Sequence, residues 1–281
     1  MKPPFAYFGG KTNLAERIVT LLPAHKHYVE PYCGSLAVLL AKQPAKMETV
    51  NDLDHELITW WRILRDRPDD LARVCALTPH SRTEYVAARH RRLDDELEVA
   101  RRVWVMLSQG RGLTLRPGKT GWKHYVFPFG SSLGMPGYLE AYVDRIAAAA
   151  DRLSMVSLEC LPALDLIRKY GKEPDVLLYV DPPYLGTTRD HRNNYRHEMK
   201  SEADHRALAE VLLEARAAVV LSGYASDLYD RDLYAGWDRH TLSAFTGNSS
   251  GDRSRTEVLW SNRPLGTQSA LFDLATAPAH L

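Results

Sequence analysis

The sequence predicts an α/β protein whose Rossmann-like sheet is interrupted by an inserted, mostly helical segment. The run Val176–Val180 is wholly apolar and is stopped by two prolines, as expected for a strand buried on both faces of a parallel sheet. Near the amino terminus, strand and helix patterns alternate as in the front half of a nucleotide-binding unit. Between Arg65 and Arg152 this alternation is lost, and a basic, helix-rich pattern replaces it.

Each strand of the predicted sheet leads through a turn to a helix. The first strand, His27–Glu30, is followed by a turn containing Gly34 and by a helix over Ser35–Lys42. The second strand, Glu48–Val50, ends in Asn51 and Asp52. The remaining predicted elements are the strand Met155–Cys160, a helix starting at Leu161, the strand Val176–Val180, the helix Asp204–Arg216, and the strands Ala218–Ser222 and Glu257–Trp260.

Composition limits the classes of protein that need to be considered. The chain has 281 residues and a formal net charge of +1, so any nucleic-acid binding must come from a local basic patch. Three separated cysteines without a CxxC pair favour a reducing cytoplasm. No apolar run reaches the roughly 18 to 20 residues of a membrane span. The eleven histidines are scattered, and we expect no metal site.

The segment Asp181-Pro182-Pro183-Tyr184 directly follows the most strongly predicted strand. Ligands of parallel sheets bind at the carboxyl ends of the strands, which is where this loop begins. Asp181 and the Pro182 carbonyl are two hydrogen-bond acceptors suited to an exocyclic amine, and Tyr184 can stack on a planar base. The alternative is a strand end with a plain Asp turn.

Two further segments indicate a site for a nucleotide-like ligand. Gly9, Gly10 and Lys11 precede a predicted helix and allow close approach of backbone to a ligand, although a simple glycine turn explains the same pattern. Asp52 lies about 20 residues beyond the first glycine turn, where an acidic residue accepts hydrogen bonds from ribose hydroxyls. Asp54 is expected to cap the next helix.

Two basic segments are candidates for contact with phosphate. The stretch from Arg111 to Tyr125 mixes cations with glycine and aromatic residues, and the loop Thr187–Lys200 carries further arginines. A loop without a binding function is the alternative for both. The predicted DNA-binding residues are Arg111, Arg116, Lys119, Trp122, Lys123, Arg189, Arg192 and Arg196.

Taken together, these segments resemble the Dam-type DNA adenine-N6 methyltransferases over roughly Phe5 to Asn262. The resemblance rests on an aromatic-GGK opening, a Glu-Pro-aromatic-x-Gly turn, an Asn-Asp-x-Asp strand end and the Asp-Pro-Pro-Tyr loop, in that order. It implies a seven-stranded sheet with a reversed last pair, S-adenosylmethionine as methyl donor, and a flipped adenine of double-stranded DNA as acceptor. The catalytic residues that it implies are Asp181, Pro182, Pro183 and Tyr184.

The resemblance also implies a donor site and a division into domains. Residues 1–64 and 153–264 would form the catalytic domain, 65–152 the inserted target-recognition domain, and 265–281 a flexible tail. Leu36 departs from the family pattern, which has a second glycine there, and its side chain is expected to narrow the donor's approach. The implied donor-binding residues are Tyr7, Gly9, Gly10, Lys11, Glu30, Pro31, Gly34, Ser35, Asp52, Leu53, Glu159, Cys160 and Asp181.

Several other functions remain compatible with these residues. The same methyl transfer could act on cytosine N4, on RNA or on a protein amide, and a homologue with impaired catalysis could bind DNA alone. A nucleotide-dependent oxidoreductase is disfavoured because the full GxGxxG motif is absent. A restriction-modification enzyme, a phage enzyme and a host regulator all suit the sequence. We expect a cytoplasmic monomer or weak dimer.

Overall fold

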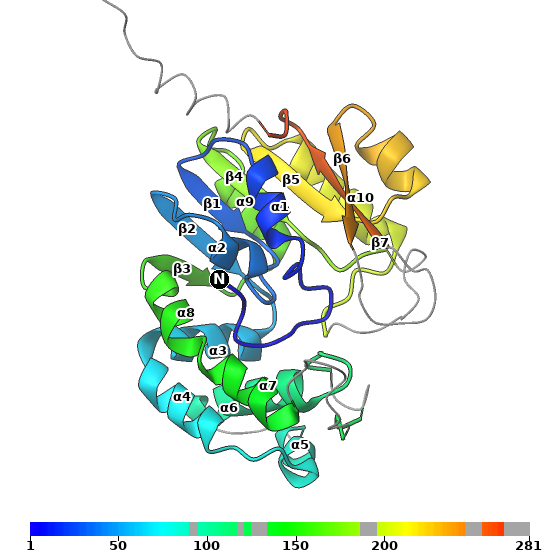
Figure 1. Cartoon of the computed structure of the whole chain (residues 1–281). Coiled ribbons are helices and arrows are strands. Elements are labelled where there is room, and N and C mark those ends of the chain that lie inside the picture. Colours follow the sequence, from blue (N-terminus) through cyan, green and yellow to red (C-terminus); the bar gives the residue numbers. More distant parts are fainter. Residues whose placement is uncertain (90–94, 117–120, 125–133, 186–195, 245–254, 267–281) are drawn as a thin grey trace, which may run out of the picture.

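The sheet has seven strands in the order β3-β2-β1-β4-β5-β7-β6, and it occupies the upper half of the view in Figure 1. The computed structural model describes residues 1–89, 95–116, 121–124, 134–185, 196–244 and 255–266. The first five strands are parallel to one another, and β7 is antiparallel to both of its neighbours. The strands are β1 (His27–Glu30), β2 (Met47–Asn51), β3 (Val156–Glu159), β4 (Val176–Val180), β5 (Ala218–Gly223), β6 (Asp238–Ala244) and β7 (Arg255–Ser261).

Helices cover both faces of the sheet, which explains why β4 is apolar at every position. Leu177 and Tyr179 pack in one hydrophobic cluster with helices α1 (Ala15–Leu21) and α2 (Ala37–Ala41). Leu178 and Val180 pack in a second cluster with α9 (Ala163–Tyr170) and α10 (Glu202–Leu213). Successive side chains of a strand point to opposite faces, so both must be apolar here.

A layer of helices lies below the sheet in Figure 1. Its core joins that of the sheet, since Trp60 and Trp104 share one hydrophobic cluster with Tyr28 of β1. The predicted domain boundary after Leu64 falls inside α3, which packs against α6 and α8. The helices of this layer are α3 (His55–Asp66), α4 (Pro68–Ala76), α5 (Arg82–Ala88), α6 (Glu96–Gln109), α7 (Met135–Val143) and α8 (Ile146–Leu153).

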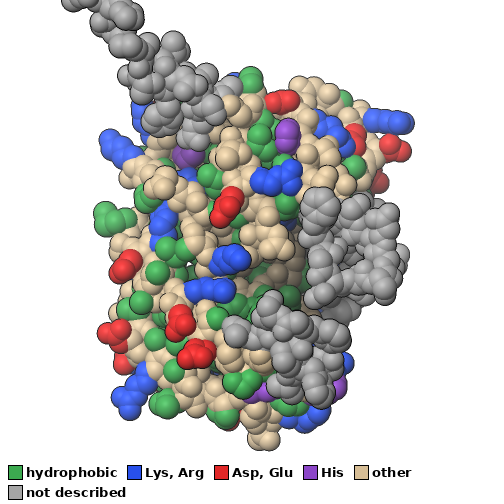
Figure 2. All heavy atoms as spheres, in the orientation of Figure 1, with side chains coloured by type: hydrophobic (Ala, Val, Ile, Leu, Met, Phe, Trp, Pro, Cys, Tyr) green, Lys and Arg blue, Asp and Glu red, His purple; other side chains and the backbone are tan. Residues whose placement is uncertain are grey.

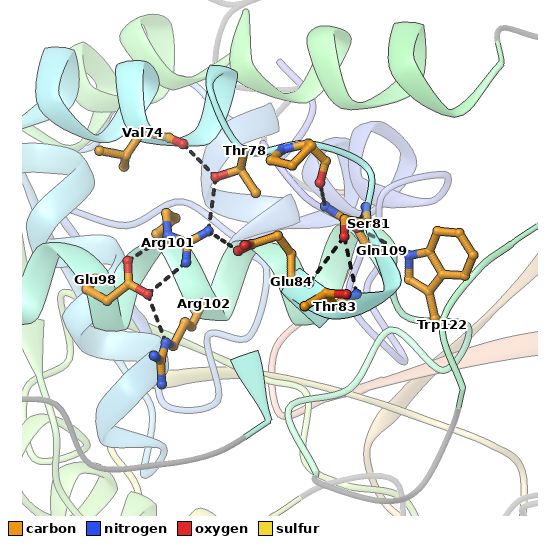
Figure 3. Close-up of polar contacts among 11 residues, drawn as sticks. Val74, Thr78, Ser81, Thr83, Glu84, Glu98, Arg101, Arg102, Gln109 and Trp122 are labelled. Atoms are coloured by element: carbon orange, nitrogen blue, oxygen red, sulfur yellow. Dashed lines mark hydrogen bonds and ion pairs between the residues drawn. The ribbon is translucent and has the colours of Figure 1, made fainter. Parts of the chain in front are cut away.

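Partly buried polar contacts fix α4, α5 and α6 against one another (Figure 3). Arg101 of α6 pairs with Glu98 on its own helix and with Glu84 of α5, and it donates to Thr78 at 3.1 Å. Gln109, at the end of α6, accepts from the Ser81 backbone amide at 3.1 Å. Charge-assisted contacts of this kind restrict how the helices can be arranged.

The segment between β5 and β6 contains a short π-helical turn, Leu228–Leu233. Among the described residues, no helix is both long and apolar enough to span a membrane. The same part of the chain holds no cluster of three or more His, Cys, Asp or Glu side chains suited to a metal ion.

Candidate active site

Three neighbouring strands bring acidic residues to one edge of the sheet. β1 lies between β2 and β4 and is parallel to both. Their carboxyl ends therefore meet, and they carry Glu30, Asp52 and Asp181. This juxtaposition is the one expected for a ligand site in an open parallel sheet.

Lys11 connects the amino-terminal segment to the end of β4. Its Nζ donates to Oδ1 and Oδ2 of Asp181 at 2.8 and 2.7 Å and to the Gly9 carbonyl at 3.0 Å. Burial tends to lower the pKa of Lys11, but Asp181 and Glu257 raise it above its ordinary value. Burial raises the pKa of Asp181, an effect that Lys11 opposes and Glu257 reinforces.

Tyr184 is held by two carboxylates. Its hydroxyl contacts Asp181 Oδ1 at 3.0 Å and also contacts Glu257 Oε1 on β7. The Lys11 Nζ lies 4.9 Å from the centre of the Tyr184 ring, and Tyr224 packs edge-on against that ring at 4.7 Å. The ring orientation is therefore fixed by packing and by its hydroxyl.

Glu30 is a buried carboxyl at the end of β1. Burial raises its pKa to about 8, an effect that the hydrogen bond from Tyr28 opposes and Asp181 adds to. The Tyr28 hydroxyl donates to Glu30 Oε2 at 3.0 Å. At neutral pH the side chain of Glu30 is therefore mainly the neutral acid.

The first glycine turn is organised by Asp52. Gly34 has a φ of +44°, a left-handed conformation, and its amide donates to Asp52 Oδ2 at 3.1 Å. Asp52 Oδ1 accepts from the Asp54 amide at 2.9 Å. Burial raises the pKa of Asp52 to about 6, so the carboxylate is mainly ionised at neutral pH. Trp61 of α3 donates to the Gly34 carbonyl at 3.0 Å and ties the turn to the helical layer.

These strand ends enclose a cavity of about 290 Å³, near the lower end of the roughly 300–1,000 Å³ range of ligand sites. Glu159 and Cys160, which were predicted to bind the donor, do not line the cavity. The wall that follows β3 is formed instead by Pro162, Ala163 and Leu164. The predicted donor-site residues that do line it are Tyr7, Gly9, Gly10, Lys11, Glu30, Pro31, Gly34, Ser35, Asp52, Leu53 and Asp181.

Hydrogen bonds on either side of Cys160 explain why the residues after it line the cavity in place of Glu159 and Cys160. The Glu159 side chain accepts from Lys169 at 3.3 Å and from Tyr170 at 3.4 Å, both on α9. The buried side chain of Asn51 accepts from the Leu161 amide at 2.8 Å and donates to the Pro31 carbonyl at 2.9 Å. Asn51 thus holds the chain after β3 against the first turn.

The segment Arg196–Met199 forms a further wall of the cavity. Arg196 pairs with Asp54 and Glu56 at 2.7 Å each and donates to the Leu115 carbonyl. This residue was predicted to bind DNA, but its guanidinium is largely buried and paired with two carboxylates. In the structure it instead links the cavity to α3 and to the insert.

Leu36 does not restrict the cavity, contrary to the sequence-based expectation. It adopts the left-handed conformation, with a φ of 55°, but its side chain is fully buried in the hydrophobic core. Its neighbours Ser35, Ala37 and Val38 line the cavity, whereas Leu36 does not. The side chain that replaces a glycine therefore points away from the ligand site.

The predicted DNA-binding residues of the insert differ in accessibility. Arg111 is exposed and contacts His124, and Arg116 is half-buried. Trp122 stacks on His80 at 4.5 Å, and its Nε1 donates to Gln109 at 3.3 Å (Figure 3). The half-buried Lys123 has its pKa lowered by burial. Lys119, Arg189 and Arg192 lie outside the described residues.

On the face of the molecule drawn in Figure 2, cations do not gather in one place. In Figure 2, lysine and arginine side chains are interspersed with acidic ones instead of forming one continuous field. The picture agrees with the net charge of +1. Local contacts, and not a general positive potential, must therefore attract a polyanion.

Glu257 lies beside the candidate site, although its place in the sequence indicated only a strand residue. It is only 6% exposed and accepts from Ser222 at 2.7 Å. The available signal was a lone acidic residue before the apolar run Val258–Trp260. A carboxylate in that position is costly to bury unless it has partners.

The strand order and the Asp-Pro-Pro-Tyr loop beside a cavity define the class of Rossmann-like methyltransferases. The chain belongs to the family of D12 class N6 adenine-specific DNA methyltransferases, whose family model matches residues 7–246. The enzyme is therefore a DNA methyltransferase that acts on the N6 amine of adenine.

Two curated relatives match over most of their length. The chain is similar to the type II methyltransferase M1.LlaDCHI of Lactococcus lactis subsp. cremoris, with 26% identity over 93% of this chain and 95% of the relative. It is also similar to the retron Ec67 DNA adenine methylase of Escherichia coli, with 27% identity over 89% of this chain and 88% of the relative.

Proposed function

We propose that the enzyme takes its methyl group from S-adenosylmethionine bound in the cavity and transfers it to a flipped adenine held by Asp181 and Pro182. The observation that carries this proposal is the position of Asp181, which lines the cavity and begins the Asp-Pro-Pro-Tyr loop. The proposal includes double-stranded DNA as substrate, a cytoplasmic location, and action as a monomer or weak dimer.

The cavity walls fit such a donor. A Cβ atom on Gly10 would lie 3.0 Å from Ser35 Oγ and 3.1 Å from the Tyr7 carbonyl, so a side chain at this position would crowd two residues that line the cavity. Backbone amides of Gly34, Leu53 and Asp54 hydrogen-bond to the Asp52 carboxylate. A carboxylate offers about four lone-pair sites, so acceptor capacity remains for a ribose hydroxyl. When bound, the donor supplies an electrophilic methyl group on a sulfonium.

The residues around Asp181 position the acceptor amine. The Asp181 carboxylate and the Pro182 carbonyl accept its two hydrogens, which turns the nitrogen lone pair towards the donor side of the site. Tyr184 stacks on the flipped base and offsets part of the few kcal/mol that flipping costs. Before the base arrives, Lys11 and Tyr184 hold the Asp181 carboxylate in place through hydrogen bonds.

The proposal is tested with Asp181→Ala. We expect loss of methyl transfer with a retained fold, because Ala removes the acceptor and leaves the buried strand intact. Purified enzyme would be incubated with labelled S-adenosylmethionine and unmethylated genomic DNA, followed by nucleoside analysis for N6-methyladenine. Donor binding is followed separately by calorimetry.

Asp175→Ala is the matched control. Asp175 precedes β4 at the opposite edge of the sheet and makes an exposed ion pair with Lys26 at 2.8 Å. This variant should methylate adenine as the wild type does. Full activity of Asp181→Ala would refute the proposed role of Asp181, and methyl label on cytosine would refute the acceptor assignment.

A further inference from the structure

Two carboxylates share one ammonium group at the carboxyl end of β4. Lys11 Nζ lies 2.7 Å from Asp181 Oδ2 and 3.8 Å from Glu257 Oε1. Both carboxylates and the ammonium are buried or nearly so, with side-chain exposures of 17%, 7% and 6% for Asp181, Glu257 and Lys11. One ammonium carries a single positive charge, so it can balance only one of the two carboxylates. One negative charge is left over, and it destabilises the ionised form of both carboxylates.

The Tyr184 hydroxyl is shared in the same way. It contacts both Asp181 Oδ1 and Glu257 Oε1, yet a phenol has a single proton to donate. Ser222 of β5 donates to the same Glu257 oxygen at 2.7 Å. Glu257 therefore competes with Asp181 for two donors, while its own position is fixed by a third.

This competition matters because Asp181 is already engaged. Lys11 contacts both of its oxygens and Tyr184 contacts one of them. A carboxylate offers about four lone-pair sites, so these three contacts from two donor groups weaken it as an acceptor for an arriving amine. Movement of Lys11 away from Asp181 and towards Glu257, whose Oε1 lies 3.8 Å from Nζ, would free acceptor sites on Asp181.

We propose that Glu257 is a positioning residue for methyl transfer. When the target amine binds, Glu257 accepts the hydrogen bonds of Lys11 and Tyr184 in place of Asp181. Asp181 is then free to accept a hydrogen bond from the amine. The inference rests on the proposed role of Asp181. Glu257 does not line the donor cavity, so its effect is exerted through Lys11 and Tyr184.

The other titratable groups near Asp181 do not offer Lys11 and Tyr184 a second ionised carboxylate. Glu30 of β1 is mainly the neutral acid at neutral pH. Burial raises the pKa of Tyr179 on β4 far above its ordinary value, and Tyr224 contacts the Tyr184 ring edge-on. Among the described residues around Lys11, the acidic partners within 4 Å are Asp181 and Glu257.

Glu257→Gln keeps the side-chain shape and removes the charge. We expect kcat to fall roughly tenfold or more, with the KM for DNA and the donor Kd within about twofold of wild type. The pH profile of kcat/KM for DNA is measured with the donor at saturation. Its acidic limb should move to lower pH by about half a unit, because loss of the negative charge at position 257 lowers the pKa of Asp181. Melting temperature is measured on the same samples.

Two companion variants separate positioning from stability. Glu257→Asp retains the charge and should recover part of kcat and the wild-type acidic limb. Ser222→Ala removes one donor to Glu257 but leaves its charge, so its acidic limb should also stay in place. If Glu257→Gln lowers only the melting temperature, or lowers kcat while the acidic limb stays unmoved, the inference is wrong. Failure of the proposed function is recognised separately, because it would appear as methyl transfer by Asp181→Ala.

Discussion

Leu36 combines a backbone conformation that favours glycine with a side chain that the core requires. Its φ of 55° is unusual for a residue with a branched side chain, and it precedes α2 at the helix start. The left-handed conformation costs roughly 1–2 kcal/mol relative to glycine. Full burial of a leucine contributes more, since its removal from a core costs about 2–5 kcal/mol. Burial therefore outweighs backbone strain at this position.

We predict that Leu36→Gly lowers the free energy of unfolding by about 1–4 kcal/mol, the lost burial less the relieved strain. The Kd for S-adenosylmethionine should stay within twofold, because the side chain faces the core. Urea unfolding and calorimetry measure the two quantities. Tighter donor binding in the glycine variant would show instead that Leu36 restricts the site.

Glu30 links protein stability to pH. Its folded pKa of about 8 lies above the ordinary value of 4.5, so the folded protein binds more protons than the unfolded chain in that range. Stability from this group is fully present below pH 4.5 and is lost as pH rises through 8. The change is on the order of 1 kcal/mol per pH unit.

We predict that Glu30→Gln flattens the decline in unfolding free energy between pH 6 and pH 8. Glutamine resembles the neutral acid and does not ionise, so it removes this proton linkage. Urea unfolding at pH 6, 7 and 8 gives the slope. Glu214→Gln, which alters an exposed carboxylate at the end of α10, should keep the wild-type decline. Equal slopes for Glu30→Gln and wild type would contradict the prediction.

At the level of elements, the segment Arg196–Met199 joins parts of the protein that are distant in sequence. The Tyr32 hydroxyl, in the first turn, lies 3.4 Å from the Met199 sulfur, and His205 of α10 contacts the Met199 carbonyl at 3.1 Å. At the other end, Arg196 reaches α3 and the insert. The segment is thus fixed at both ends while it covers the cavity.

We predict that Arg196→Gln weakens binding of S-adenosylmethionine about tenfold, equivalent to about 1.4 kcal/mol, because it releases one end of this segment. Calorimetry gives the affinity. Arg206→Gln is the matched control, since Arg206 pairs with Glu202 and Asp232 on the exposed side of α10. An unchanged donor affinity combined with weaker DNA binding would favour the earlier interpretation of Arg196 as a DNA contact.

At the level of the whole molecule, DNA affinity must come from a few local cations. The net charge of +1 gives no general attraction to a polyanion. Arg111 is the exposed cation nearest the bridge between Gly110 and Trp122 in the insert. A phosphate contact by this residue would contribute to the salt dependence of binding.

We predict that Arg111→Ala weakens duplex binding most at low salt. Loss of one phosphate contact lowers the slope of log K against log salt by about 0.9. Fluorescence anisotropy between about 50 and 200 mM salt measures this slope. Lys172→Ala is the control, because that exposed lysine precedes β4 at the opposite edge of the sheet. Parallel lines for Arg111→Ala and wild type would exclude a phosphate contact.

Features that depend on local pattern could be read directly from the amino-acid sequence. The apolar run before Asp181 predicted a strand buried on both faces, and Gly34 predicted a turn, which the structure shows to be left-handed at that glycine. The order of the four motifs specified the family. β6 could not be predicted in this way, because it is an edge strand and, among its side chains whose burial is described, Leu242 is the one that is buried.

Which side chains come into contact could be seen only once the chain was folded. Lys11, Asp181 and Glu257 lie far apart in the chain, and the strand order brings them together. In the folded chain, the Leu36 side chain is buried in the core and Arg196 forms an ion pair with Asp54. Such outcomes depend on the long-range packing of whole elements, whereas sequence spacing reports only which residues share a face or a turn of one element.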